Sequence, residues 1–171
     1  ILKKLTLNPD EEDEFIDKDI SIKDYLIEIL NSFKEISMKK FIFNFDQDSN
    51  SKKIVKSIEI VYGLRNFIGN SNKFSNEYVF INLKSDSEFT EISIEDDGPG
   101  YPKDIISKIG EPYLKSNNPQ DKSKTGLGLG LFIGKTLLEK NFASVICRNS
   151  KTRSGAEVII KWRNKELFNI Q

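Results

Sequence analysis

Five of the ten glycines in this chain fall in two short clusters, Asp96-Asp97-Gly98-Pro99-Gly100 and Gly126-Leu127-Gly128-Leu129-Gly130. Each glycine adds backbone entropy that folding must remove, so such clusters favour places where the chain takes positive φ or approaches a ligand closely. The second cluster opens a segment with helical character, and the free N–H groups and dipole of a helix start attract phosphate. Together, the carboxylate turn and the glycine-rich helix start predict a nucleotide site.

The composition fits one globular domain without a net charge. A chain of 171 residues is long enough to bury a core, and Lys+Arg and Asp+Glu are equal at 26 each. The net charge therefore favours neither nucleic acid nor an acidic membrane as a partner. No apolar run approaches the length that spans a bilayer. The single cysteine, Cys147, excludes an internal disulfide, and its apolar surroundings in the sequence are typical of a buried strand.

The chain contains no histidine and begins with Ile1 rather than methionine. We therefore interpret it as a piece of a longer protein, in which any chemistry that needs an imidazole comes from elsewhere. Residues 1–7 are expected to be the last turns of a helix. Residues 10–14 are all acidic and are expected to lie in a solvated linker.

Hydrophobic periodicity predicts the order of the remaining elements. Helices are expected at 21–36, 58–74 and 126–140, with a short one at 102–109. Strands are expected at 40–46, near 54–55, and at 78–83, 91–96, 143–148 and 156–162. Residues 111–125 are polar and without periodicity, which predicts a long loop. This order favours helices layered on one face of a mixed sheet.

The predicted helix 58–74 has two distinct faces. Asn66, Asn70 and Lys73 share one stripe, at i, i+4 and i+7. The opposite stripe suits packing on the sheet and consists of Ile60, Leu64, Phe67, Ile68 and Ser71. One interpretation is that the Asn70 carbonyl binds Mg²⁺ while Lys73 reaches phosphate. The alternative is a solvated helix face, and the stripe on its own favours that alternative.

Asp96 ends a strand in which apolar and polar residues alternate. The alternation places it on the same side as Ile92 and Ile94, so a carboxylate faces an apolar environment. This is costly unless the carboxylate meets a hydrogen-bond donor, and the exocyclic amino group of a purine is one such donor. Gly98 and Gly100 would let the chain turn tightly around the base. The alternative is an ordinary Asp-Asp-Gly turn.

Two common phosphate-binding motifs are excluded. A P-loop ending at Gly134-Lys135-Thr136 needs glycine where Leu129 stands, and Lys135 falls well inside a helix. A dinucleotide fingerprint needs a strand before Gly126, where the sequence is a polar loop. What remains is a glycine-rich helix start after a flexible loop, with Lys115, Lys122 and Lys124 as candidate phosphate contacts.

In chain order, these segments resemble the motifs of the ATP-binding domain of sensor histidine kinases, in the GHKL (Bergerat) superfamily. Residues 66–74 resemble the N box, 96–100 the G1 box, 111–115 the F box and 125–131 the G2 box, and 154–156 resemble the final glycine turn. Residues 62–67, 109–113 and 130–139, with Trp162, further resemble the RegB/PrrB-type redox-responsive kinases. The likeness departs at Gly110, where the F box usually has phenylalanine, and at Ser71, where alanine is usual.

The resemblance implies a fold and a domain organisation. The fold is an α/β (α+β) two-layer sandwich, whose mixed, mostly antiparallel sheet is covered on one face by three helices, with a mobile ATP lid. Residues 1–19 would be the end of an upstream dimerisation and phosphoacceptor helix with an acidic linker. Residues 20–163 would be the ATP-binding kinase domain, and 164–171 a C-terminal tail.

The resemblance also implies roles for individual residues. Asn70 would be the Mg²⁺ ligand, supported by Asn66, with Lys73 on phosphate. Asp96 would read the adenine amino group, and Lys115 would approach the γ-phosphate. The remaining positions implied to bind ATP are Phe74, Gly98, Gly100, Tyr113, Gly126, Leu127, Gly128, Leu129, Gly130 and Leu131.

The implied function is transfer of the γ-phosphoryl group of Mg-ATP to a histidine on an upstream helical domain, for relay to a cytoplasmic response regulator. The full-length protein would be a homodimer, cytoplasmic in this part, with an anchor in the bacterial inner membrane as one option. This part itself would contact neither nucleic acid nor membrane. Because phosphoryl transfer depends on positioning and charge neutralisation, the domain needs no nucleophile of its own.

Three alternatives remain open at this point. A GHKL-type ATPase would activate water with a glutamate one turn before the magnesium asparagine, but Asn66 stands there and cannot act as a base. A protein serine kinase domain fits the F-box and G2 details less well. A regulatory module that binds nucleotide without catalysis is the third, and the intact N, G1 and G2 boxes argue against it.

Overall fold

The computed structural model describes residues 20–46, 53–54, 57–109 and 127–168. The helices are α2 (Ile22–Lys34), α3 (Ile58–Phe74), α4 (Lys103–Ile106), α5 (Leu127–Lys140) and α6 (Asn164–Leu167). The strands are β1 (Ile20–Ser21), β2 (Lys40–Phe45), β3 (Lys53–Ile54), β4 (Tyr78–Ser85), β5 (Phe89–Asp96), β6 (Ser144–Asn149) and β7 (Ala156–Arg163).

A five-stranded sheet with the order β2-β4-β5-β7-β6 forms the base of the fold. Strand β2 pairs in parallel with β4, whereas the β4–β5, β5–β7 and β6–β7 pairs are antiparallel. The two short strands β1 and β3 pair with each other in a separate antiparallel ribbon. The large sheet is therefore mixed and mostly antiparallel, as predicted.

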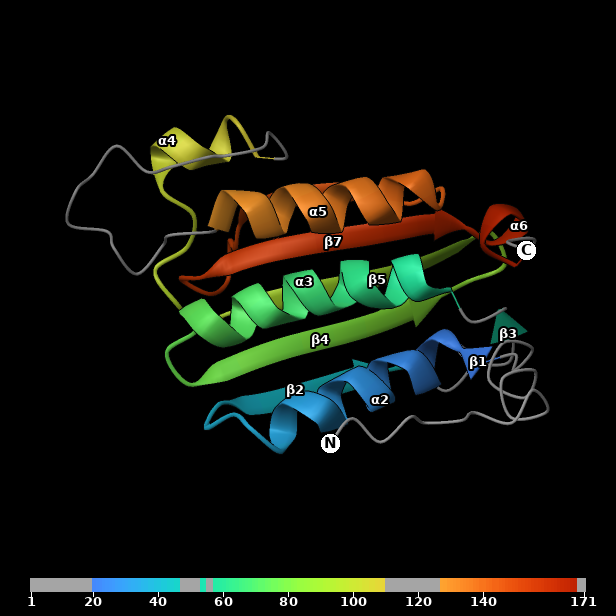
Figure 1. The fold of residues 1–171 in the computed structure, drawn as a ribbon, viewed down its shortest axis with the longest axis horizontal. Coiled ribbons are helices and arrows are strands. Elements are labelled where there is room, and N and C mark those ends of the chain that lie inside the picture. The colour runs from blue at the N-terminus through green and yellow to red at the C-terminus, as the bar shows by residue number, and fades with distance from the viewer. Residues whose placement is uncertain (1–19, 47–52, 55–56, 110–126, 169–171) are drawn as a thin grey trace, which may run out of the picture.

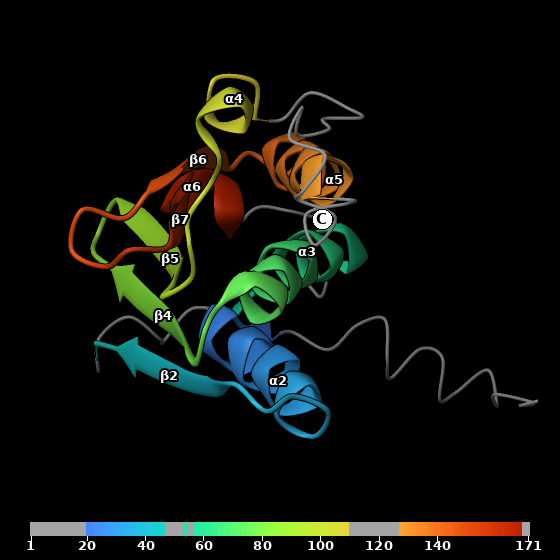
Figure 2. The same cartoon turned by 90° about the vertical axis from the view of Figure 1, so that its left-hand side faces the viewer.

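Helices α2, α3 and α5 lie side by side on one face of this sheet (Figures 1 and 2). Alternate side chains of the central strands point into the layer between helices and sheet and are buried, because successive strand residues face opposite sides. The buried strand residues include Val79, Ile81, Leu83, Ile92, Ile94, Val158 and Ile160. The predicted two-layer sandwich with three covering helices is confirmed.

Local sequence signals start two of the three covering helices. The Ser21 hydroxyl accepts a hydrogen bond from the Asp24 N–H at 3.1 Å, and Ser57 caps α3 through the Ile60 N–H at 3.3 Å. Helix α3 spans the predicted residues 58–74, and its predicted packing stripe is buried throughout. Of the opposite stripe, Asn70 faces the pocket described below.

Several boundaries differ from the sequence-based expectations. Helix α2 ends at Lys34 rather than at residue 36, and the Ile36 side chain is 80% exposed. Strands β4 and β5 are longer than expected, because Asp86 accepts the turn N–H groups of Glu88 and Phe89. The short helix α4 is confined to four residues.

The expected C-terminal tail begins with a helix that belongs to the core. Leu167 of α6 is fully buried. The Asn164 N–H donates to the Glu88 carbonyl at 2.7 Å, and the Asn164 side chain accepts from the Thr90 hydroxyl at 2.7 Å. These bonds fix α6 against the β4–β5 hairpin, so the packed core continues past residue 163 into the first residues of the expected tail.

Parts of the expected organisation lie outside the described residues, namely the upstream helix and linker at 1–19 and the whole of the loop at 111–125. In the described part of the chain, no helix has both the length and the apolar character needed to cross a membrane.

Candidate functional site

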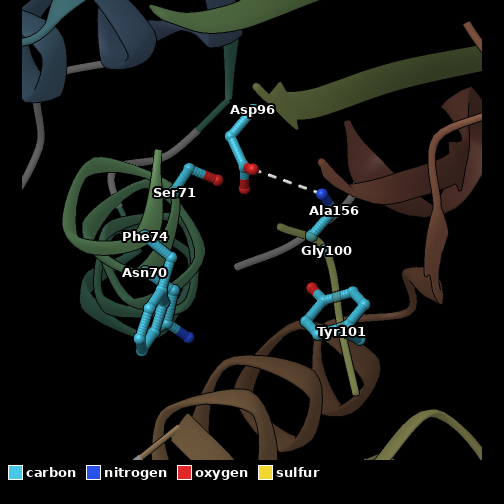
Figure 3. A pocket seen from close by; sticks show the side chains of 7 residues that line it. All are labelled: Asn70, Ser71, Phe74, Asp96, Gly100, Tyr101 and Ala156. Atoms are coloured by element: carbon cyan, nitrogen blue, oxygen red, sulfur yellow. Dashed lines mark hydrogen bonds between the residues drawn. The ribbon is translucent and has the colours of Figure 1, made fainter. Parts of the chain in front are cut away.

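A pocket lies between α3, the end of β5 with the turn after it, and the start of β7 (Figure 3). Each of these elements contributes at least one side chain or backbone segment to its wall. The lining residues are Asn70, Ser71, Phe74, Asp96, Gly100, Tyr101 and Ala156. The structure thus brings the asparagine helix and the carboxylate turn together, although they are far apart in the sequence.

Asp96 is the buried acid of this pocket, with a side chain that is 2% exposed. Its Oδ1 accepts hydrogen bonds from the backbone N–H of Gly98 at 2.9 Å and of Ala156 at 3.2 Å. Both hydrogen bonds described for this carboxylate end on the same oxygen. Burial raises the Asp96 pKa above its ordinary value, and the two N–H groups oppose that shift without cancelling it.

This arrangement refines the strand prediction for Asp96. Ile92, Ile94 and Asp96 all face the buried side of β5, as the alternation indicated. The donors that the carboxylate needs are supplied in part by the protein backbone itself. Because they hold one oxygen, the orientation of the whole carboxylate is fixed, and Oδ2 is available to a donor on a ligand.

The glycines around Asp96 are explained by close approach and by backbone conformation. A Cβ at Gly98 would lie 2.2 Å from the Phe74 carbonyl oxygen, so this turn packs directly on the C-terminal end of α3. Gly100 has φ of +78°, a conformation that side chains disfavour, and it lines the pocket. Gly98 is therefore needed for contact with α3, and its expected part in a turn around a base stays a prediction.

Asn70 faces the pocket from α3. Its side-chain nitrogen is buried and has no hydrogen-bond partner among the described residues. Gly130 of α5 lies so close that a Cβ there would be 3.1 Å from that nitrogen. A buried amide N–H₂ group without a partner is costly, which is a reason to expect a hydrogen-bond acceptor such as a phosphate oxygen there. Mg²⁺ takes oxygen ligands and commonly uses only one or two protein groups beside phosphates and water, so a single carboxamide fits it.

Asn66 and Lys73 share the helix face of Asn70 but do not line the pocket. The Asn66 amide donates to the Tyr62 carbonyl of its own helix at 2.7 Å. The Lys73 ammonium lies 5.2 Å from the centre of the Phe74 ring, on an exposed side chain. The structure therefore brings Asn70 and Asp96 together and leaves these two side chains at the margin.

The glycine-rich start of α5 contributes little to the described pocket wall. Gly128 is buried, Leu129 is 45% exposed, and the Leu131 side chain is fully buried in the core. Leu131 can thus meet a phosphate only through its backbone. Lys135 lies inside α5 and pairs with Glu139, in agreement with the exclusion of a P-loop. Tyr113, Lys115 and Gly126 lie outside the described residues, as does the side chain of Leu127.

Sequence reasoning missed the role of Asp97. Its carboxylate accepts the backbone N–H groups of Asn76, Glu77 and Tyr78 at distances between 2.8 and 3.2 Å. These bonds tie the chain after α3 to the turn that carries Asp96, so they fix the two walls of the pocket relative to each other. The Asp-Asp pair in the sequence was the available signal, because an aspartate often caps a neighbouring backbone turn.

Asn149 was missed as well. Its side-chain oxygen accepts the Tyr101 N–H at 2.7 Å, and its amide donates to the Tyr101 carbonyl at 3.2 Å. Tyr101 is thereby held at 7% exposure in the pocket wall. Contacts across 48 residues leave no local pattern in the sequence, so nothing could have indicated this pair. Two residues before Asn149 on β6, burial raises the pKa of the Cys147 thiol to about 12, so it stays protonated at neutral pH.

Comparison with known proteins identifies a matching family, similar sequences and solved structures with the same fold. Residues 56–166 match the family described as histidine kinase-, DNA gyrase B-, and HSP90-like ATPase. The sensor histidine kinase RegB of Cereibacter sphaeroides is 36% identical over 108 residues, which cover 60% of this chain and 23% of RegB. The chain thus spans less than a quarter of the length of this curated relative.

Solved structures agree on the fold. The catalytic domain of the histidine kinase ThkA superposes with a TM-score of 0.67 at 18% identity, covering 85% of this chain and 95% of that one. The mycobacterial sensor histidine kinase MprB gives a TM-score of 0.68 at 18% identity, covering 85% of this chain and 97% of that one. At this level of identity the likeness establishes the architecture.

Proposed function

The chain belongs to the histidine kinase-, DNA gyrase B-, and HSP90-like ATPase family, and on that premise we propose that it is the Mg-ATP-binding domain of a two-component sensor histidine kinase. The observation that carries the proposal is the placement of Asp96 and Asn70 on facing walls of one pocket. A fixed carboxylate suits a donor on the base. The Asn70 N–H₂ group without a partner suits an acceptor such as a phosphate oxygen, and the oxygen of the same carboxamide suits a cation. A nucleotide with bound magnesium offers all three.

The base would lie against Asp96. The 6-amino group of adenine donates to Oδ2, while Oδ1 is held by the protein backbone. Phe74 and Tyr101 add apolar surface to the same pocket, which favours a planar ring. A 6-oxo purine would place an acceptor against an acceptor and lose this bond.

The phosphates would lie toward Asn70 and the start of α5. Asn70 would give an oxygen to Mg²⁺, with Asn66 and Lys73 at the margin to orient it and to contact phosphate. The backbone of residues 126–131 would meet the triphosphate, because the N–H groups at a helix start are unpaired and attract anions. Lys115 is proposed to approach the γ-phosphate. Bound magnesium would neutralise phosphate charge in the transfer.

The acceptor of the phosphoryl group would lie outside this chain, which contains no histidine. We place it on an upstream helical domain that dimerises, with residues 1–19 as the connection and residues 20–163 as the kinase domain extended by α6. A response regulator would then take the phosphoryl group. The domain would act in the cytoplasm, beside an inner-membrane anchor elsewhere in the protein.

The test is a titration of the chain with a non-hydrolysable ATP analogue, with and without Mg²⁺, followed by addition of a helical phosphoacceptor domain. We expect magnesium-dependent binding, no labelled phosphate on this chain from γ-labelled ATP, and label on the added domain. Brisk hydrolysis by the chain alone would favour an ATPase instead. Binding without transfer to any histidine domain would favour a regulatory module.

A further inference from the structure

The connection between β6 and β7 lies directly beside the buried acid of the pocket. A Cβ at Gly155 would be 2.2 Å from Asp96 Oδ1, and the next residue, Ala156, donates its N–H to that same oxygen at 3.2 Å. The Ser150 N–H closes the connection by donating to the Gly155 carbonyl at 2.8 Å. The position of this connection therefore decides whether the carboxylate of Asp96 keeps one of its two backbone donors.

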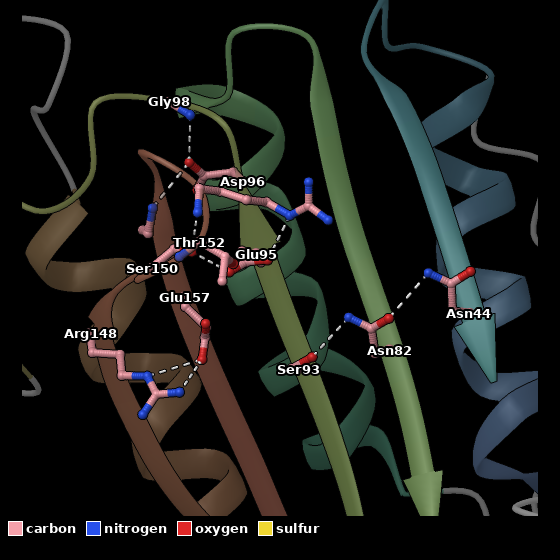
Figure 4. A network of polar contacts seen from close by, with 12 residues as sticks. Asn44, Asn82, Ser93, Glu95, Asp96, Gly98, Arg148, Ser150, Thr152 and Glu157 are labelled. Atoms are coloured by element: carbon pink, nitrogen blue, oxygen red, sulfur yellow. Dashed lines mark hydrogen bonds and ion pairs between the residues drawn. The ribbon is translucent and has the colours of Figure 1, made fainter. Parts of the chain in front are cut away.

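A second buried acid holds the connection in place. Glu95 precedes Asp96 on β5, and its side chain is on the opposite face of the sheet, as strand geometry requires. Only 8% of Glu95 is exposed. Its carboxylate accepts the Ser150 hydroxyl and, at 2.8 Å, the Nε–H of Arg153. Both donors come from the β6–β7 connection, and Figure 4 shows Glu95 and Ser150 near the end of β5. We call Glu95, Ser150 and Arg153 the Glu95 cluster.

The cluster is also braced internally and against the sheet. The Ser150 hydroxyl oxygen accepts the Arg153 backbone N–H at 2.9 Å. The Arg153 guanidinium lies 3.4 Å from the centre of the Phe80 ring, on the strand next to Glu95. Charge-assisted bonds to a buried carboxylate are stronger than neutral ones, so this brace can fix a short loop that glycine would otherwise leave free.

We propose that the Glu95 cluster is a set of positioning residues that sets the preference of the pocket for a 6-amino over a 6-oxo purine. The cluster touches no ligand itself. It holds Ala156 against Asp96 from the far side of the sheet, so that Oδ2 presents a single acceptor direction to the base. This inference rests on the proposed function, in which Asp96 reads the purine.

The consequence of loosening the cluster follows from geometry. Without the Ala156 donor, the carboxylate keeps only the Gly98 N–H and can rotate about that bond. A rotating carboxylate meets the 6-amino group in the right direction for less of the time, so ATP binds more weakly. A 6-oxo purine never made that bond and loses nothing. The preference for ATP therefore falls, because the affinity for ATP decreases while the affinity for the 6-oxo purine nucleotide stays the same.

The experiment compares the binding of ATP and inosine triphosphate to the 171-residue chain by calorimetry. Ser150→Ala and Arg153→Gln each remove one of the two side chains that donate hydrogen bonds to Glu95. Lys140→Gln is the matched control, because Lys140 pairs with Glu59 at 3.3 Å, between α5 and α3 and away from the Glu95 cluster. Ser150→Thr keeps the hydroxyl and is the rescue variant.

For the parent we expect a preference for ATP of about tenfold or more, the value of one hydrogen bond to a buried charged group. Either cluster variant should lower it to about threefold or less, mainly through ATP. Lys140→Gln and Ser150→Thr should keep the parent value. Equal weakening of both nucleotides, or an unchanged preference, would overturn the proposal. Since the Arg153 side chain is 42% exposed, Arg153→Gln carries the test if Ser150→Ala fails to fold.

A second readout needs no nucleotide. Amide hydrogen exchange at Ala156 should be faster in Ser150→Ala than in the parent and unchanged in Lys140→Gln, and equal rates in all three chains would contradict the role of the cluster. Failure of the proposed function looks different. If Asp96→Asn binds ATP as tightly as the parent, the reading of the base by Asp96 is wrong, whatever the cluster variants show.

Discussion

Asp96 and Asp97 are neighbours in the chain, and the fold shifts their pKa values in opposite directions. Burial raises the Asp96 pKa, and its backbone donors offset that only in part. Burial acts on Asp97 as well, but the N–H groups of Glu77, Tyr78 and Asn76 outweigh it and lower the Asp97 pKa. At neutral pH the ionised Asp96 side chain therefore lowers the stability of the fold, whereas the ionised Asp97 side chain raises it. Asp96 lines the pocket, and Asp97 fixes the two walls of the pocket relative to each other.

Replacing Asp97 by asparagine should destabilise the domain at neutral pH. A group with a lowered pKa stabilises the fold above its ordinary value, and that stability is lost as the pH falls through the folded-state pKa. We expect a loss of about 1 kcal/mol in the free energy of unfolding at pH 7, since the group is partly exposed. The difference from the parent should shrink toward pH 3, as followed by urea unfolding. A difference that is the same at both pH values would contradict this origin.

Replacing Asp96 by asparagine should separate stability from binding. A group with a raised pKa stabilises the fold below its ordinary pKa, and that stability is lost as the pH rises through the folded-state pKa. The ionised Asp96 side chain therefore destabilises the fold at pH 7. Asp96→Asn should therefore melt no lower than the parent at pH 7. It should bind ATP about tenfold more weakly or worse, because its amide N–H₂ faces the amino donor of adenine. Glu88→Gln, at an exposed turn, is the control. A much lower melting temperature of Asp96→Asn at pH 7 would contradict the expected effect on stability.

Asn70→Ala tests the proposed metal ligand. The buried nitrogen of Asn70 has no partner among the described residues, so removing the amide should change the free energy of unfolding by less than about 1 kcal/mol. The gain in ATP affinity on adding Mg²⁺ should disappear, as measured by titration at two magnesium concentrations. Asn44→Ala, on the edge strand β2 away from the pocket, should keep that gain. If Asn70→Ala keeps it too, the metal lies elsewhere.

Two glycines of α3 should respond in opposite directions to alanine. At Gly69 the nearest atom to an added Cβ is 3.6 Å away, on the Phe33 ring, so Gly69→Ala should stabilise the domain by about 0.5–1 kcal/mol through helix propensity. At Gly63 the Cβ would lie 2.6 Å from Leu138 of α5, so Gly63→Ala should cost about 1–3 kcal/mol. Thermal unfolding of both variants checks the pair. Equal effects would mean that α3 and α5 pack less closely than described.

The sequence predicted the scaffold well because the scaffold follows periodicity. The alternation in β5 indicated the buried side of Asp96, and the helical stripe at Ile60, Leu64 and Phe67 indicated the packing face of α3. What the sequence could not supply were bonds between distant segments. Nothing near Glu95 in the sequence points to Arg153, since hydrogen bonds across 58 residues depend on how strands are ordered in the sheet. The contact of Gly98 with α3 and the packing of α6 on the β4–β5 hairpin likewise join distant segments and left no signal in the sequence.

Phe142 should be replaceable by glycine with a gain in stability. It follows the C-terminal end of α5 with φ of +69°, and its ring is 59% exposed. This left-handed conformation costs a residue with a Cβ about 1–2 kcal/mol, whereas glycine adopts it without strain but is freer in the unfolded chain. Phe142→Gly should therefore raise the free energy of unfolding by up to about 1 kcal/mol in urea titrations. Phe142→Ala, which keeps the Cβ and loses the ring, should give no gain. If the glycine variant is less stable than the parent, the exposed ring must pack well enough on its surroundings to outweigh the backbone strain.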